Sequence, residues 1–271
     1  MDITYDDLVL YCPSARQPDE SVIEQMESWI MQARHHARKL LGYTFFSDVV
    51  AAEKESYAVL VPLLKRYICL KAYSLAIPSL DLVLTPTGFG VVSNQNLAPA
   101  SADRVRVLRE SVQNDADKAL EDLLDALRDF EEWTESTQSM QYFQSLFWRS
   151  EDLRYFGRPD ATRRDYIAMR PEIMGAESEL IKLIGQAQFC RLINGIKHTS
   201  LTAIQDAVLL RCRLFVVAVA NQTGVENERK RLLSAIEENL DSFPLYAMSS
   251  NYEANHYPRY QNKKDDTCYF F

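Results

Sequence analysis

Apolar residues recur three and four positions apart along most of the chain, which is the spacing of one face of an α-helix. The first stripe covers residues 22–41 and follows the helix-capping sequence Pro18-Asp19-Glu20-Ser21. Gly42 stands where a glycine commonly ends a helix. The pattern therefore predicts a helix over residues 22–41 with a glycine C-cap.

A second stripe begins after Ser47 and runs to about Ala76, where Ile77-Pro78 should stop the helix. Pro62 lies inside this stripe. Because proline lacks an N–H and crowds the preceding turn, we expect it to bend this helix or divide it in two.

The remaining helical patterns lie beyond residue 100. Ser101 should cap a third helix, whose apolar face extends to about Phe130. An aromatic-rich segment follows over residues 140–156. Pro171 suits the first turn of a helix reaching about Ile196, and two further helices are predicted. These two cover residues 200–220 and 225–240.

One short segment breaks the helical pattern. Residues 82–92 read LVLTPTGFGVV, with apolar and β-branched residues on both sides of a Pro-Thr-Gly turn, which is typical of a β-hairpin. Two strands alone are only marginally stable in water, so the hairpin needs support from its own helices or from another chain. We expect it to contact another chain, with Leu84, Phe89 and Val91 as interaction residues.

The C-terminal segment, residues 249–271, is polar and aperiodic but rich in aromatic residues. A segment this polar buries too little surface to fold by itself, so we expect it to be extended and bound to a partner. The expected anchors are its aromatic side chains Tyr257, Tyr260, Tyr269, Phe270 and Phe271. The alternative is that the segment folds back on its own domain.

The sequence thus predicts an all-α protein, a helical bundle with one short β-hairpin insertion and an extended C-terminal tail. Three regions are expected. Residues 1–135 form a helical domain with the hairpin at 81–93, residues 136–248 a second helical region, and residues 249–271 the tail.

Composition narrows the function classes. The chain has 271 residues, 47% of them hydrophobic and 25% charged, as in an ordinary globular protein. Its net charge of -8 disfavours general binding to nucleic acid, which needs clustered Lys and Arg. The sequence shows no signal peptide and no apolar stretch that could span a bilayer. Five cysteines without a CxxC pair indicate reduced thiols, and Cys190 and Cys212 are expected in the core.

No motif nominates catalytic chemistry. The sequence lacks GxSxG, a phosphate-binding P-loop and HExxH, and Gly88-Phe89-Gly90 is explained by turn geometry. Only Glu253-x-x-His256 has the spacing of a di-iron ligand pair, and no second copy exists. We therefore expect no catalytic residue, cofactor or metal. The basic cluster around His35 and His36 suits the end of its helix, or contact with an acidic partner or nucleic acid.

The predicted third helix is electrically polarised. Arg104, Arg106 and Arg109 lie near its start, while residues 110–135 hold ten acidic residues against Lys118 and Arg128. This order opposes the helix dipole, which favours acidic residues first and basic residues last. The acidic face is either solvated or selected by an external partner.

The first 130 residues resemble the small helical head–tail connector (adaptor) proteins of tailed phages and prophages. The similar features are an acidic opening, a capped first helix, a second helix rich in Leu and Tyr, and a long segment before the third helix. The corresponding sequences are Ile3-Thr4-Tyr5-Asp6-Asp7-Leu8, Pro18-Asp19-Glu20, residues 22–42, the set Leu63, Leu64, Tyr67, Ile68, Leu70 and Tyr73, and TPTGFGVVSNQNLAPAS.

The resemblance implies a ring of identical subunits that docks on the portal protein and on other neck or tail proteins. DNA would pass through such a ring without sequence-specific contact, and an acidic lining would let it slide. The implied location is the virion, and the host cytoplasm during assembly. The chain is longer than such connectors, and residues 136–245 have no counterpart. Two other classes stay open: a non-viral helical interaction or regulatory protein, and an enzyme with an unrecognised site.

Overall fold

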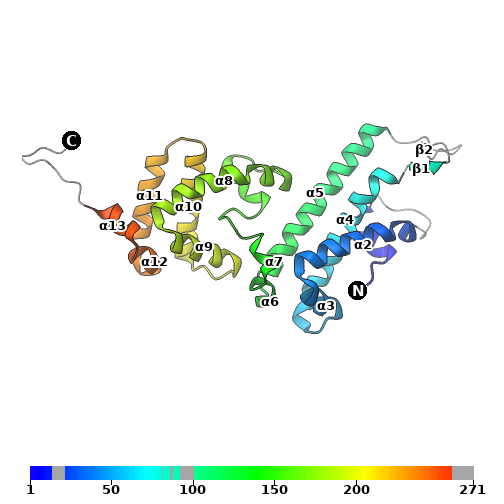
Figure 1. Cartoon of the computed structure of the whole chain (residues 1–271), viewed down its shortest axis with the longest axis horizontal. Coiled ribbons are helices and arrows are strands. Elements are labelled where there is room, and N and C mark those ends of the chain that lie inside the picture. The colour runs from blue at the N-terminus through cyan, green and yellow to red at the C-terminus, as the bar shows by residue number, and fades with distance from the viewer. Residues whose placement is uncertain (14–21, 81, 86–87, 92–100, 258–271) are drawn as a thin grey trace, which may run out of the picture. The chain divides into compact units, whose positions relative to one another are not determined.

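The computed structural model describes residues 1–13, 22–80, 82–85, 88–91 and 101–257 (Figure 1). The all-α prediction is confirmed in these ranges, where seven α-helices are longer than ten residues. The chain divides into two compact units. Unit 1 comprises residues 1–144, 148–168 and 197–199, and unit 2 comprises residues 145–147, 169–196 and 200–271.

The elements of unit 1 precede those of unit 2 along the chain, except that helices α8 and α9 have residues in both. Unit 1 contains α1 (Tyr5–Tyr11), α2 (Val22–Leu41), α3 (Tyr43–Ala51), η2 (Glu55–Val59), α4 (Leu60–Ala76), η3 (Ile77–Ser79), β1 (Leu82–Thr85), β2 (Gly88–Val91), α5 (Ala102–Leu127), α6 (Glu131–Thr134), α7 (Thr137–Met140) and η4 (Ser150–Phe156). The later elements are α8 (Arg163–Ile184), α9 (Gln186–Lys197), α10 (Ala203–Ala220), α11 (Val225–Glu237), η5 (Leu240–Ser242), α12 (Pro244–Ala247) and α13 (Ser250–His256).

Helix α4 is the centre of unit 1, since α2 and α5 both pack against it (Figure 1). Its sequence is apolar nearly all round, so it is buried on several sides, and Leu64 and Ile68 have no exposed surface. Helix α5 faces it with a single apolar stripe that is buried from Val112 to Leu127. One apolar helix covered by two amphipathic ones therefore forms the core of unit 1.

Two predicted helix ends are confirmed by their local geometry. Helix α2 ends at Leu41, and Gly42 follows with a φ of +83°, a conformation that glycine adopts without strain. Helix α5 begins at Ala102, and the Ser101 side chain accepts a hydrogen bond from the Arg104 N–H.

The predicted second helix is three separate elements. Helix α3 starts directly after Gly42 rather than after Ser47, and it ends at Ala51, before Ala52, whose φ of +51° is left-handed. The short 3-10 helix η2 intervenes before α4. The segment is divided, which is one of the two expected outcomes, but it breaks between Ala52 and Leu60, before Pro62. Pro62 lies in the first turn of α4, where an N–H has no partner inside the helix.

The prediction that Pro171 starts a helix is wrong. Helix α8 begins earlier, at Arg163, where Thr162 and Asp165 bond reciprocally and so satisfy the first backbone N–H groups. Pro171 lies inside this helix. The helix ends before Gly185, whose φ is +86°, so the segment up to 196 is two helices rather than one.

The aromatic-rich segment belongs mainly to unit 1, so the units divide further along the chain than the predicted boundary after residue 135. Trp133 has no exposed surface, and its indole N–H donates to the Leu40 carbonyl oxygen at 3.0 Å. Its ring packs against that of Phe143, which in turn contacts the Trp148 ring, with the Phe143 and Trp148 centroids 5.2 Å apart. Aromatic packing therefore joins this segment to the end of α2.

Unit 2 is a bundle in which α10 packs against α11. Cys212, Phe243 and Tyr246 are fully buried in it. Cys190, in contrast, is exposed, which corrects its predicted place in the core. It lies on the solvent side of α9, where the Gln186 side-chain amide donates to its sulfur at 3.1 Å.

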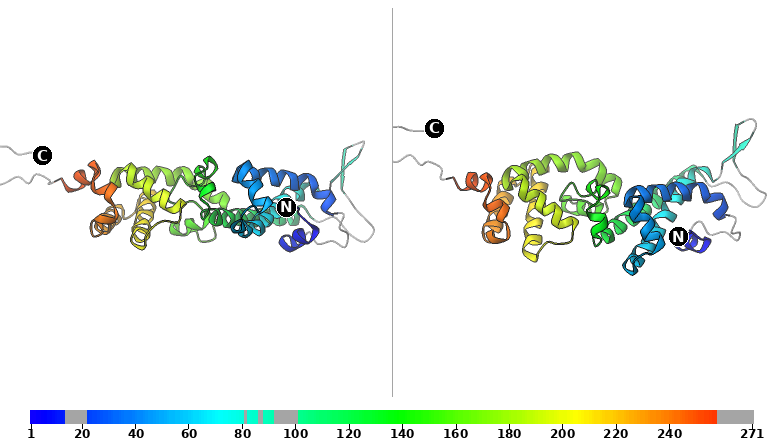
Figure 2. Two further views of the ribbon diagram at one scale, coloured as in Figure 1. Left: turned by 90° about the horizontal axis from the view of Figure 1, so that it is seen from below. Right: turned by 60° about the horizontal axis from the view of Figure 1, so that its bottom comes forward.

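Residues 82–91 include two four-residue strands. Strands β1 and β2 pair antiparallel, and each has the other as its partner in the sheet (Figure 2). The register sets Leu82 opposite Val91 and Leu84 opposite Phe89. Because residues opposite each other and residues two apart share a face, these four apolar positions all fall on one face of the ribbon.

The expectation of an extended segment from residue 249 is wrong for its first part. Ser249 caps α13, which occupies residues 250–256, and its side chain accepts the Tyr252 N–H at 3.2 Å. Asn255 donates to the Leu183 carbonyl oxygen at 3.0 Å, so α13 is attached to α8 of the same unit. Tyr257 is 78% exposed, and Tyr260, Tyr269, Phe270 and Phe271 lie outside the described residues.

Candidate functional site

Helix α5 carries the polarised charges, and most of its acidic residues have partners inside unit 1. Asp122 pairs with Arg66 at 2.7 Å, and Asp125 pairs with Arg128 at 2.6 Å. Beyond the helix, Glu132 pairs with Lys54. These pairs explain much of the acidic composition without an external partner.

Glu121 is the most deeply buried acidic residue of α5, with 9% of its surface exposed. Its carboxylate accepts hydrogen bonds from the Ser150 N–H at 2.9 Å and the Ser150 hydroxyl at 2.8 Å, and it pairs with Arg163 at 3.1 Å. A buried carboxylate with three donors is well compensated. This cluster holds η4 and the start of α8 against α5.

Asp117, one turn earlier on α5, is half-buried beside this cluster. Burial raises the pKa of its carboxyl, and hydrogen bonding from Gln113 and the charge of Arg163 partly oppose that rise. The cluster contains a serine hydroxyl but no histidine, and its carboxylate Glu121 is paired with Arg163, so its chemistry is that of an ion-pair network.

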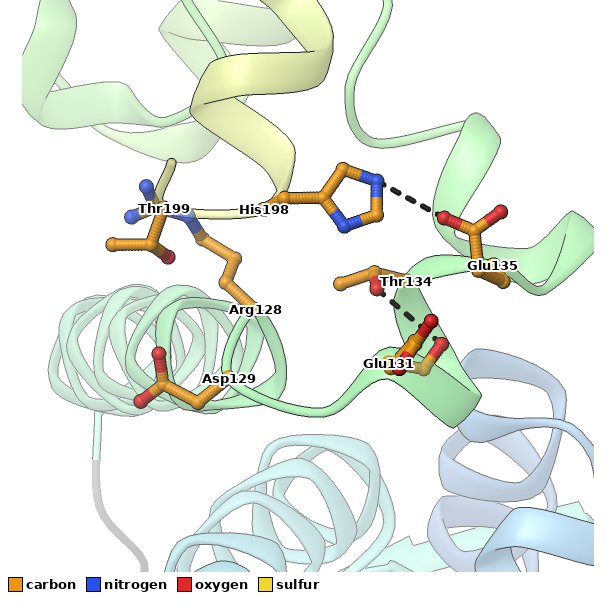
Figure 3. A pocket seen from close by; sticks show the side chains of 7 residues that line it. All are labelled: Arg128, Asp129, Glu131, Thr134, Glu135, His198 and Thr199. Carbon is orange, nitrogen blue, oxygen red and sulfur yellow. Dashed lines mark hydrogen bonds and ion pairs between the residues drawn. The ribbon is translucent and has the colours of Figure 1, made fainter. Parts of the chain in front are cut away.

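A polar cleft of about 510 Å³ lies at the C-terminal end of α5 (Figure 3). Figure 3 shows the His198 ring pointing toward Glu135, with its Nε2 atom 3.1 Å from the carboxylate. The seven residues that line the cleft are Arg128, Asp129, Glu131, Thr134, Glu135, His198 and Thr199. All of them are polar or charged.

The cleft lacks the parts of a hydrolytic site. Its one buried hydroxyl, on Thr134, donates to the Glu131 carbonyl oxygen at 3.3 Å and so is not directed at His198. Thr199 has a φ of +50°, because it takes the left-handed position at the end of α9 that glycine usually holds. The strained backbone therefore has a structural cause, and the His198–Glu135 pair has no nucleophile to activate.

Unit 2 contains a second buried carboxylate, Glu177 of α8, which is 2% exposed. It accepts hydrogen bonds at 2.8 Å from the Ser145 hydroxyl and from the Leu146 N–H. Arg213 of α10 donates twice to the Leu146 carbonyl oxygen, at 2.7 and 3.0 Å. The two charged side chains thus clamp the backbone of residues 145–147 into unit 2.

Burial raises the pKa of the Glu177 carboxyl from 4.5 to about 7, and the two hydrogen bonds and Arg213 limit the rise. Neither this clamp nor the Glu121 cluster was predicted. Glu177 had a visible signal, because it sits at helical spacing among Ile173, Leu180 and Ile184, which are all buried. A carboxylate inside an apolar stripe indicates a buried polar contact.

The remaining sequence candidates are dispersed. His35 and His36 are exposed on α2, and neighbouring Arg34 contacts Asp2 and the Met1 carbonyl oxygen rather than the end of its own helix. His256 pairs with Glu237 at 3.1 Å. In the part of the chain that the structure describes, no group of His, Cys, Asp and Glu could hold a metal ion. No helix of that part is long and apolar enough to cross a membrane.

Comparison with known protein families gives a match that covers the helices of unit 1 from α2 to α7. Residues 21–142 match a family of unknown function (DUF6712). No curated protein and no solved structure matches the chain. The match covers less than half of the 271 residues, and the family description assigns no activity to them.

Proposed function

We propose that this protein is a structural component of a tailed-phage or prophage particle, a head–tail connector that forms a ring on the portal protein and extends the DNA channel. The resemblance of the first 130 residues to such connectors is the starting point. The partners in this proposal are identical subunits, the portal protein and other neck or tail proteins. Its location is the virion, and the host cytoplasm during assembly.

The observation that carries the proposal is the hairpin in unit 1. Its register puts Leu82, Leu84, Phe89 and Val91 on one face, whereas the opposite face holds Val83 and Thr85 with two glycines. Within the described ranges the sheet has only these two strands, so both of its outer edges have unpaired backbone groups. An apolar ribbon with open edges is suited to docking on another chain.

The negative net charge of the molecule supports a role in which DNA passes the protein without being bound tightly. Exposed acidic residues on α5, such as Asp115 and Asp122, repel phosphates, and the net charge is -8. A channel protein needs this property, since a strongly basic lining would retain the DNA.

The hairpin should be required for assembly. Replacing Phe89 and Val91 by Asp puts two charges on the apolar face, which makes docking costly because a buried unpaired charge is strongly unfavourable. We expect the variant to keep the helical circular dichroism of the wild type and to lose binding to rings of the portal protein from the same phage or prophage. Cosedimentation with those rings, followed by electron microscopy, measures this.

The matched control is Val83→Asp with Thr85→Asp, which adds the same charge to the opposite face of the same ribbon. This control should bind almost as the wild type does. Equal binding of all three proteins would contradict the role of the apolar face. If even the wild-type protein does not bind the portal rings and is missing from purified particles, the non-viral alternative, a helical interaction or regulatory protein, replaces the connector.

The C-terminal anchors can now be separated from the part of the tail that folds. Deleting residues 258–271 should leave the melting temperature of unit 2 unchanged and weaken portal binding, since Tyr260, Tyr269, Phe270 and Phe271 are lost. Deleting residues 249–271 also removes α13 and its bonds to α8, so the melting temperature should fall too. Thermal unfolding and the cosedimentation assay measure both effects. Portal binding unaffected by either deletion would rule out the anchor role.

A further inference from the structure

The first part of α5 carries apolar residues that the described residues of its own unit leave uncovered. The core-facing stripe of this helix is buried from Val112 onward, but Leu108 and Val105, one and two turns earlier on the same stripe, are only half-buried. Val107 beside them is 57% exposed. The helix therefore begins with an uncovered apolar surface.

This uncovered surface is bordered by arginines. Arg104 and Arg109 are exposed and form no ion pair among the described residues, while Arg106 pairs only with Asp103 and Glu110 of its own helix. We call residues 104–109 the basic end of α5.

Further along the chain, acidic residues recur every seven positions. Asp115, Asp122 and Asp129 are all exposed. The seven-residue spacing keeps Asp115 and Asp122 on one face of α5, and Asp129 follows two residues beyond the last residue of the helix, Leu127. Asp122 pairs with Arg66, whereas Asp115 and Asp129 form no ion pair in the described ranges. Lys118 lies near this line and reduces its charge only in part. We call Asp115, Asp122 and Asp129 the acidic line.

The charge order costs the isolated helix stability, because arginines near an N-terminus and aspartates near a C-terminus both oppose the helix dipole. Most other acidic residues near α5 have internal partners, but the basic end and two members of the acidic line do not. The two are complementary in charge. A single subunit cannot join them, since the basic end lies on the same rigid helix as Asp115 and Asp122, and Asp129 directly follows that helix.

We propose that the basic end of α5 in one copy docks against the acidic line of the next copy. Such a contact is head-to-tail, so it leaves a free basic end and a free acidic line at the two ends of every dimer. Head-to-tail contacts of this kind close into rings or extend as filaments. The inference rests on the proposed function only in that a connector ring would use this contact.

Charge reversal tests the contact with little risk of unfolding. Arg104→Glu with Arg109→Glu reverses the basic end, and Asp115→Lys with Asp129→Lys reverses the acidic line. Arg104→Glu and Asp129→Lys place charges that the dipole favours at the two ends of α5, and all four substituted residues are exposed, so both variants should fold as well as the wild type. Circular dichroism and thermal unfolding verify this.

Sedimentation velocity measures the association. The wild-type chain should self-associate at about 0.05 M salt and dissociate at about 0.5 M, since screening is stronger there. Each double variant alone should associate at least about tenfold more weakly, because like charges then face each other. A mixture of the two variants, or a variant carrying all four changes, should recover association. As a control, Glu172→Lys with Arg191→Glu, two exposed residues of unit 2, should change nothing.

Three results would overturn the inference: a wild-type chain that stays monomeric, double variants that associate like the wild type, or a folded four-residue variant that fails to recover. The inference also fails if the Arg104→Glu and Arg109→Glu variant self-associates like the wild type but loses binding to nucleic acid or to a different acidic protein. That result would assign the basic end to another partner. Portal binding is read separately. If the charge variants behave as expected but the protein does not bind portal rings, the connector function fails and the α5 contact stands. If the protein binds portal rings but the charge variants associate like the wild type, the α5 contact fails and the connector function stands.

Discussion

Replacing Trp133 by alanine should destabilise unit 1 by about 4 kcal/mol, the cost typical of removing a fully buried tryptophan. The indole has no exposed surface, and its ring lies 6.2 Å from that of Phe143 between centroids. The substitution also leaves the Leu40 carbonyl oxygen without its donor. That carbonyl is in the last turn of α2, where the helix itself supplies no donor. Urea unfolding followed by circular dichroism measures the loss.

Two further variants separate the contributions. Trp133→Phe keeps most of the apolar contact and removes only the hydrogen bond, so about 1 to 2 kcal/mol should be lost. Tyr43→Ala removes an aromatic ring that is 61% exposed, and its effect should stay within about 0.5 kcal/mol. A Trp133→Ala variant as stable as Tyr43→Ala would show that the contact between α2 and the segment after α5 contributes nothing to stability.

Replacing Glu177 by glutamine should remove a pH dependence of the stability of unit 2. The folded-state pKa of about 7 lies above the value of 4.5 for a free carboxyl, so the folded chain binds the proton more tightly than the unfolded chain. Stability from this group is complete below about pH 4.5 and is lost as the pH rises through 7. Between these limits the wild type should lose about 3 kcal/mol.

Glutamine is neutral throughout this range and retains an oxygen that can accept the Leu146 N–H. The variant should therefore match the wild type near pH 5 and exceed its stability near pH 8. Glu172→Gln, on the exposed side of the same helix, controls for the change in net charge and should follow the wild type. Chemical unfolding at both pH values measures the difference. Parallel pH curves for wild type and Glu177→Gln would contradict the raised pKa.

The buried clusters also bear on how the chain is organised. Residues 145–147 belong to unit 2 although the residues on both sides belong to unit 1. Glu177 and Arg213 satisfy both the N–H and the carbonyl oxygen of Leu146, so this short segment is fixed by side chains rather than by a strand or helix. Because these two side chains bind the backbone of one residue, Leu146, they fix which residues of this segment lie in unit 2.

The helices and several of their ends follow from the sequence alone. The stripe of α2, its Gly42 end and the Ser101 cap of α5 depend on residues no more than four positions apart, and such contacts are visible in the sequence. The wrong helix starts at Ser47 and Pro171 also have local causes: one helix begins directly after the left-handed Gly42, and the other after Thr162, which bonds reciprocally with Asp165. In both places the sequence contains two nearby residues that can start a helix, and the earlier one is used.

Only the tertiary structure decided which polar residues are buried together and where the units divide. Glu121 meets Arg163, 42 positions away, and the Trp133 indole meets Leu40, 93 positions away. No periodicity within one segment encodes such a partner, because it depends on which helix faces which. The same reason applies to residues 250–256. Their composition indicates a free tail, but contacts with α8 supply the polar partners that let the chain form a helix there.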